Sequence, residues 1–178
     1  VVLGWIRGFA AGKGWSGCLA FPRLVEPDER AGIRQRVHPA IEALRVGEPT
    51  HWSGIVDGKV VIDADAGHSV EVHATLRRPG TLHVAGIPLT WDGDAIHLGG
   101  SASPLTVDGA LDLVVFVDRT TVEVFADEGR TVLTRVVYPE RRDPEVALSG
   151  QHVSADVVVH RLAPCGITPS TTSRTSTQ

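Results

Sequence analysis

Acidic side chains are the residues of this sequence best suited to catalysis, because two carboxylates can share acid, base and nucleophile roles. Four of them follow a strongly apolar stretch: Asp118, Glu123, Asp127 and Glu128. Hydrolysis by a carboxylate pair needs the two groups about 5–10 Å apart across the bond being cleaved. The spacing reveals no such pair, and Asp118 and Glu123 fit better as a turn residue and a residue on a solvated strand face. We assign no catalytic residue here.

Two glycine-rich patterns near the N-terminus match known motifs only in part. Residues 12–17 read G-x-G-x-x-G, but a phosphate-binding loop of this type must lead into a helix. Residues 14–18 resemble the elbow that presents a nucleophilic serine, here Ser16, but Cys18 replaces the final glycine. Pro22 follows closely and disfavours a helix in both cases. We predict a flexible loop.

Candidate metal ligands are wrongly spaced. Residues 63–67 begin like a calcium loop, yet the sixth and twelfth positions hold His68 and Ala74 in place of Gly and Glu. His68 and His73 are five residues apart, so on one strand they would point to opposite faces. For these histidines and for His83, a surface or sheet position without a metal is the default interpretation. The sequence predicts no metal site and no cofactor.

Composition excludes several classes of partner. Charged residues make up 21% of the 178 residues, the net charge is −4, and acids and bases are mixed along the chain, so no basic patch predicts nucleic-acid binding. No run of 18 apolar residues predicts a membrane span. The two cysteines, Cys18 and Cys165, are too few for a disulfide framework. We expect a globular chain without a membrane or nucleic-acid partner.

The elements that must position any site are almost all strands. Apolar runs and period-two alternation predict strands at residues 60–63, 69–76, 80–84, 95–98, 111–117, 121–126, 131–137 and 153–162. Asp-Gly pairs between them favour tight turns. One short helix is predicted over residues 39–44, with Pro39 at its start. Roughly ten strands in residues 30–163 predict an all-β fold, an antiparallel sandwich of two sheets.

Both ends of the chain differ from this pattern. Residues 1–29 combine a strand end with a glycine-rich loop, and residues 164–178 form a Ser/Thr-rich tail that we expect to be disordered. The sequence begins with Val1, contains no Met and shows no signal peptide, so we expect a fragment of a longer protein. A cytoplasmic and a secreted bacterial location both stay open.

One segment carries a specific resemblance. Residues 116–130, FVDRTTVEVFADEGR, resemble the FVDRSSVEVFANDG signature of the invertase, levanase and inulinase family of glycoside hydrolases. Residues 134–139, 14–23, 33–39 and 1–5 are similar, in the family's order, to its T-x-R-x-[FY]-P, GWSGVLSLPREL, L-x-Q-x-P and L-x-G-W stretches. Two departures are Leu24 in place of the usual Glu and a Thr pair in place of the Ser pair.

The resemblance implies a five-bladed β-propeller followed by a jelly-roll or lectin-like β-sandwich. In this family the propeller holds an Asp nucleophile, a transition-state-stabilising Asp and a Glu acid/base, which act through a covalent fructosyl intermediate. The motifs of the nucleophile and the acid/base are absent from this sequence. Asp143 lies in an R-D-P triplet, but after the signature, so no role passes to it.

The resemblance therefore implies the C-terminal sandwich of an enzyme that cleaves sucrose, levan or inulin, with residues 1–29 as a remnant of the last propeller blade. The module would stabilise the catalytic propeller without being catalytic alone. Trp5 is the candidate contact for a fructose-containing sugar, with Trp15 less favoured. The alternatives are a fructan-binding module that uses Trp52 or Trp91 as a platform, and a structural module that forms a homodimer.

Overall fold

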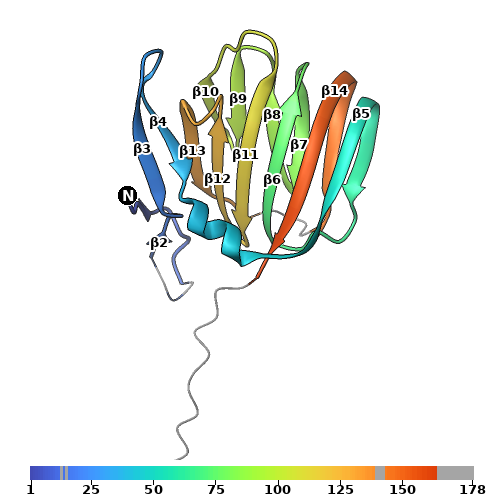
Figure 1. Cartoon of the computed structure of the whole chain (residues 1–178). Coiled ribbons are helices and arrows are strands. Elements are labelled where there is room, and N and C mark those ends of the chain that lie inside the picture. Colours follow the sequence, from blue (N-terminus) through green and yellow to red (C-terminus); the bar gives the residue numbers. More distant parts are fainter. Residues whose placement is uncertain (13, 15, 139–142, 164–178) are drawn as a thin grey trace, which may run out of the picture.

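A computed structural model describes residues 1–12, 14, 16–138 and 143–163, and strands dominate it (Figure 1). The predicted all-β fold is confirmed. The predicted tail at 164–178, Trp15 and Cys165 lie outside the described residues. Within the described part, no helix combines the length and the apolar character that crossing a bilayer requires.

Ten antiparallel strands form one sheet that folds over on itself into two layers. The strands are β5 (Arg45–Asp63), β6 (Ser69–Leu76), β7 (Gly80–Val84), β8 (Ile87–Trp91), β9 (Ala95–Leu98), β10 (Ser101–Pro104), β11 (Leu111–Asp118), β12 (Thr121–Ala126), β13 (Thr131–Val136) and β14 (Val146–Leu162). The front layer holds β13, β12, β11 and β6, and the back layer holds β10, β9, β8 and β7 (Figure 1).

The long strands β5 and β14 belong to both layers. The first part of β14 pairs with β7, and the part from Ala155 to Arg161 pairs with β6. Between these parts the pairing of β14 with β5 shifts register between Gly150 and Val153. Bulges of this kind bend a strand. The bend converts one continuous sheet into the two packed layers of a sandwich.

The main core fills the space between the layers. Inward side chains alternate along each strand with outward ones, as the burial pattern of β7 shows with Leu82 and Val84 buried and Thr81 half-buried. Leu148, Leu113 and Val157 from both layers are at most 2% exposed. Complete burial of such side chains contributes roughly 1.5–3 kcal/mol each.

The N-terminal segment adds two strand pairs outside the sandwich. β1 (Trp5–Ile6) pairs with β2 (Cys18–Leu19), and β3 (Arg23–Asp28) forms a hairpin with β4 (Gly32–Val37). The hairpin turn lies at the predicted division between residues 29 and 30, and that division stays a prediction. The predicted helix is present as the 3-10 helix η1 (Pro39–Leu44), where the His38 side chain accepts a hydrogen bond from the backbone of Ala40.

Within the sandwich, the predicted strands leave out β8, β10 and large parts of β5 and β14. β8 contains Pro88 and β10 contains Pro104, and proline lowers strand propensity. The first half of β5 contains Gly47 and Pro49 and has mostly exposed side chains. Such strands form because tertiary pairing overrides local propensity.

Candidate functional site

The outer face of the front layer is covered by the N-terminal segment, and this junction is the most distinctive region of the molecule. Phe116 of β11 and Phe125 of β12 point outward, yet they are only 2% and 4% exposed. A second apolar cluster buries them together with Phe21, Val37, Ile41, Leu44, Val114, Val132 and Leu162. The signature segment at 116–130 thus faces residues from the start of the chain.

A buried ion pair lies at the centre of this junction. The Arg23 guanidinium binds the carboxylate of Glu123, which is 2% exposed, and also donates to Thr134 Oγ1 at 2.7 Å. The backbone N–H of Phe21 donates to Glu123 Oε1 at 2.8 Å. Our prediction that Glu123 lies on a solvated strand face is wrong, because β3 and the segment before it cover that face of β12. Asp118 does lie at a turn, where its backbone carbonyl accepts from the Thr121 hydroxyl.

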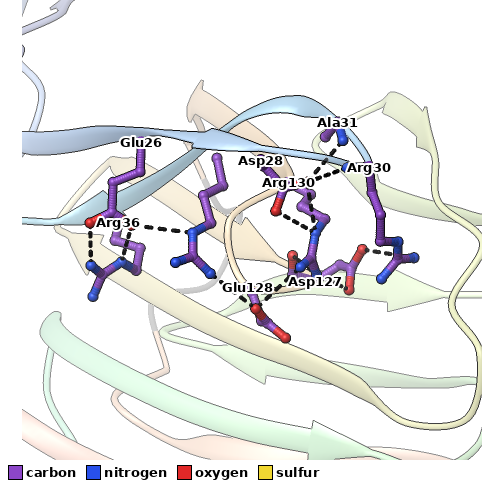
Figure 2. A network of polar contacts seen from close by, with 9 residues as sticks. Glu26, Asp28, Arg30, Ala31, Arg36, Asp127, Glu128 and Arg130 are labelled. Atoms are coloured by element: carbon purple, nitrogen blue, oxygen red, sulfur yellow. Dashed lines mark hydrogen bonds and ion pairs between the residues drawn. The ribbon is translucent and has the colours of Figure 1, made fainter.

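A network of charged side chains fastens the β3–β4 hairpin to the turn between β12 and β13 (Figure 2). Arg130 donates from Nε to both carboxylate oxygens of Asp28, at 3.0 and 3.2 Å, and from Nη1 to Asp127. Glu128 pairs with Arg34 of β4 at 3.2 Å. The carboxylates Asp127 and Glu128 are therefore bound to arginines and serve in docking.

Gly129 brings this turn into direct contact with β4. Its carbonyl accepts a hydrogen bond from the Gln35 backbone at 2.9 Å, and its φ is +81°. A Cβ at this position would lie 1.8 Å from the Gln35 carbonyl oxygen. Only glycine allows both the backbone conformation and the close approach.

A cavity of about 210 Å³ lies beside the junction, between β4, η1 and the outer face of β6, β11 and β12. Glu71, 3% exposed, lines it and binds Arg45 through two hydrogen bonds of 2.7 Å and His73 Nε2 through another of 2.7 Å. Burial acts to raise the pKa of Glu71, but the hydrogen bonds from Arg45 and His73 outweigh it and lower the pKa to about 2. Glu71 is thus a fixed anion, whereas a general acid near neutral pH needs a raised pKa.

The described residues hold no arrangement that could bind a metal ion through three or more His, Cys, Asp or Glu side chains. His68 lies before β6 and His73 within it, so the two are not brought together as ligands. Ser16 leads into the short strand β2 and not into a helix, which excludes the helix-linked elbow there. Asp143 lies in the connection between β13 and β14.

Trp5 and its neighbours form an exposed apolar surface at the N-terminal end of the molecule. Val1, Leu3, Trp5 and Leu19 are 58–78% exposed, and we call these four residues the N-terminal apolar patch. The Trp5 indole packs so closely on Gly17 that a Cβ there would lie 2.5 Å from its nitrogen. The tryptophan is therefore held in place while most of its surface faces solvent.

Behind Trp5 lies a second cavity of about 300 Å³, which Arg23 also lines. The Nε of Arg23 is buried within the chain and has no hydrogen-bond acceptor among the described residues. Buried donors normally have a partner, so this N–H is an exception to the usual pairing.

The two tryptophans considered as sugar platforms do not form one. Trp91 is 5% exposed and belongs to the core between the layers, so it offers no face to a sugar. Trp52 is half-buried and packs against the same core. Glu71 and Arg45 of the cavity have no local sequence signal, because what marks them is a contact across 26 positions.

Comparison with known proteins finds a family match over the sandwich. The model of the family described as "Glycosyl hydrolases family 32 C terminal" matches residues 58–162, which cover most of the sandwich. A sucrose-6-phosphate hydrolase of Escherichia coli is 25% identical over 85% of this chain and 36% of its own length. A levanase of Bacillus subtilis is 42% identical over 26% of this chain and 7% of its own length. The chain thus spans about a third of the first relative.

Solved structures share the fold at low sequence identity. The sucrose-6-phosphate hydrolase from Lactobacillus gasseri superposes with a TM-score of 0.74 at 19% identity, over 90% of this chain and 38% of that one. The exo-inulinase from Aspergillus awamori gives 0.74 at 18% identity over 90% and 40% of the two chains. The fructan 1-exohydrolase IIa from Cichorium intybus gives 0.75 at 15% identity over 90% and 45%.

Proposed function

Because the chain belongs to the C-terminal family of glycosyl hydrolases family 32, we propose that it is the C-terminal β-sandwich module of an enzyme that cleaves β-fructofuranosides. Sucrose, levan and inulin are the candidate substrates, in keeping with the names of the relatives and neighbours. The module stabilises a catalytic β-propeller and does not itself carry the reaction, which is a retaining hydrolysis in the proposed enzyme.

The N-terminal apolar patch is the observation that carries this proposal. The four large apolar side chains of the patch are 58–78% exposed, and Leu19 joins the other three because it pairs with Trp5 between β1 and β2. Such a grouping indicates a surface that another protein surface covers. The relatives and neighbours are more than twice as long as the part that this chain matches, so they contain the additional domain that such a surface requires. Inter-domain contacts of this kind are partly apolar and of moderate area.

Arg23 lies between the sandwich and the cavity that Trp5 lines. Its guanidinium is anchored in the junction by Glu123 and Thr134, while its Nε is buried without an acceptor beside Trp5. Trp5 then lies at the boundary of the two domains, where an aromatic face can stack on a sugar in the intact enzyme. Dimerisation through the sandwich stays a prediction.

The test measures reducing-sugar release from sucrose and inulin by the chain alone, by a separately produced propeller, and by the two together. We expect no release by the chain alone and a longer half-life of the propeller's activity when the chain is added. Leu19→Asp places a charge in the N-terminal apolar patch and should abolish this protection.

Ile55→Asp is the matched control. Ile55 is 71% exposed on β5, at the edge of the sandwich opposite to β3 (Figure 1). The Ile55→Asp variant should protect the propeller as well as the unchanged chain does. Equal loss of protection in both variants, or hydrolysis by the chain alone, would contradict the proposal.

A further inference from the structure

The 210 Å³ cavity beside the junction has a floor and a rim of different chemistry. The floor is made of carbon surfaces from both sides. One side is Val37 of β4 and Ile41 of η1, and the other is Val114, Phe116 and Phe125 of the front layer. The rim is polar and open to solvent, since the side chains of His73 and Glu42 are 41% and 60% exposed. A ligand that fits must therefore be apolar on one side and polar around its edge.

The charges at the rim largely neutralise one another. Arg45 pairs with Glu71, and Arg36 pairs with Glu26 at 2.5 Å. Glu128 is paired with Arg34 and Arg130. A ligand with a full charge would have to break such pairs, because every cationic rim group is already bound to a carboxylate. The arrangement favours an uncharged ligand.

The rim nevertheless carries both hydrogen-bond donors and acceptors. Carboxylate oxygens can accept hydrogen bonds from a ligand, while arginine and histidine nitrogens can donate to it. Asp112 is the most available acceptor: it is exposed, accepts from the Thr75 hydroxyl at 2.7 Å, and forms no ion pair with another described residue. Hydroxyl groups both donate and accept, so a ring that carries several of them matches this rim.

We propose that this cavity binds one uncharged sugar unit, with an apolar face of the ring on the floor and its hydroxyls at the rim. The volume limits the ligand to one ring, because sites for drug-sized ligands measure roughly 300–1,000 Å³. The inference goes beyond the proposed function, since the site belongs to this chain alone and needs no catalytic partner. It also replaces the tryptophan platforms as the basis for sugar binding by the sandwich.

The experiment is a titration of the ¹⁵N-labelled chain with D-fructose and D-glucose, followed by amide chemical shifts. We expect saturable shifts at amides around the cavity, in β4, η1 and the start of β11, with either or both sugars. Fructose 6-phosphate should bind more weakly than fructose, because its phosphate meets Glu71, Asp112 and Glu128.

Two aspartates at opposite ends of β11 provide a matched pair of variants. Asp112 accepts from Thr75 of β6, and Asp118 accepts from Ser69 of β6 in the same way, but only Asp112 lines the cavity. Asp112→Ala should weaken sugar binding about tenfold, in line with the loss of a hydrogen bond to a charged group. Asp118→Ala should leave the affinity unchanged.

Three results would overturn the proposal: no saturable shift with either sugar, shifts confined to the N-terminal apolar patch, or equal weakening by both variants. Tighter binding of fructose 6-phosphate than of fructose would overturn the argument from rim charge. Because the titration uses the chain alone, its failure leaves the protection of the propeller unaffected, and the two proposals can fail separately.

Discussion

Arg23→Met tests whether the buried ion pair holds the N-terminal segment on the sandwich. The substitution keeps an unbranched side chain of similar length but removes the guanidinium that binds Glu123. The carboxylate of Glu123 would then remain 2% exposed, with the Phe21 N–H as its remaining donor. Met cannot reproduce the bond to Thr134 either.

The expected cost is about 3–5 kcal/mol of the free energy of unfolding, the usual result of removing one partner of a buried pair. Glu123→Leu should cost a similar amount, because it leaves a cation and a backbone N–H unpaired. The double variant should cost far less than the sum of the two, since neither charge is then left without its partner. Arg77→Met is the control: its ion pair with Asp156 is 49% and 45% exposed, and its loss should cost about 0–1 kcal/mol.

The assay is equilibrium unfolding in guanidinium chloride followed by circular dichroism, together with hydrogen exchange at the Phe21 amide. A free-energy change for Arg23→Met no larger than that for Arg77→Met, with the Phe21 amide still protected, would refute the reasoning. Loss of protection at Phe21 with an unchanged free energy would show that the segment detaches without unfolding the sandwich, contrary to a single cooperative unit.

Three further predictions concern the turn, the cavity carboxylate and the core. Gly129→Ala should lower the free energy of unfolding, measured by chemical denaturation, by more than 2 kcal/mol, because it adds a clash with β4 to the roughly 1–2 kcal/mol of left-handed strain. Gly109→Ala is the control: at φ +96° and in open space, it should show the strain alone. The pKa of Glu71 is lowered from 4.5 to about 2, so the contribution of its charge to the free energy of unfolding is present above pH 4.5 and is lost as the pH falls toward 2. Glu71→Gln should remove up to about 3 kcal/mol of this pH dependence, measured by unfolding curves between pH 2 and 7. Leu148→Ala should cost about 2–5 kcal/mol of the free energy of unfolding and so lower the thermal midpoint markedly. Ile55→Ala, at a position 71% exposed, should shift the midpoint little, and equal shifts would contradict the assigned core.

Local pattern was enough to predict most of the strands. The runs at 69–76, 80–84 and 121–126 agree with β6, β7 and β12 in both bounds, because alternating or continuous apolar residues are the direct trace of one or two buried strand faces. The signature at 116–130 indicates the family without reference to any tertiary contact. These features depend on short stretches of chain, so local sequence is enough to predict them.

What only the tertiary structure decided is how distant stretches meet. Glu123 reads as a solvated residue on an alternating strand, yet residues 102 and 100 positions away supply the N–H and the guanidinium that bury it. The path of β14 across both layers depends on a bulge that no local residue pattern announces. Burial of a polar group is a property of what folds over it, and that covering is set by packing of the whole chain.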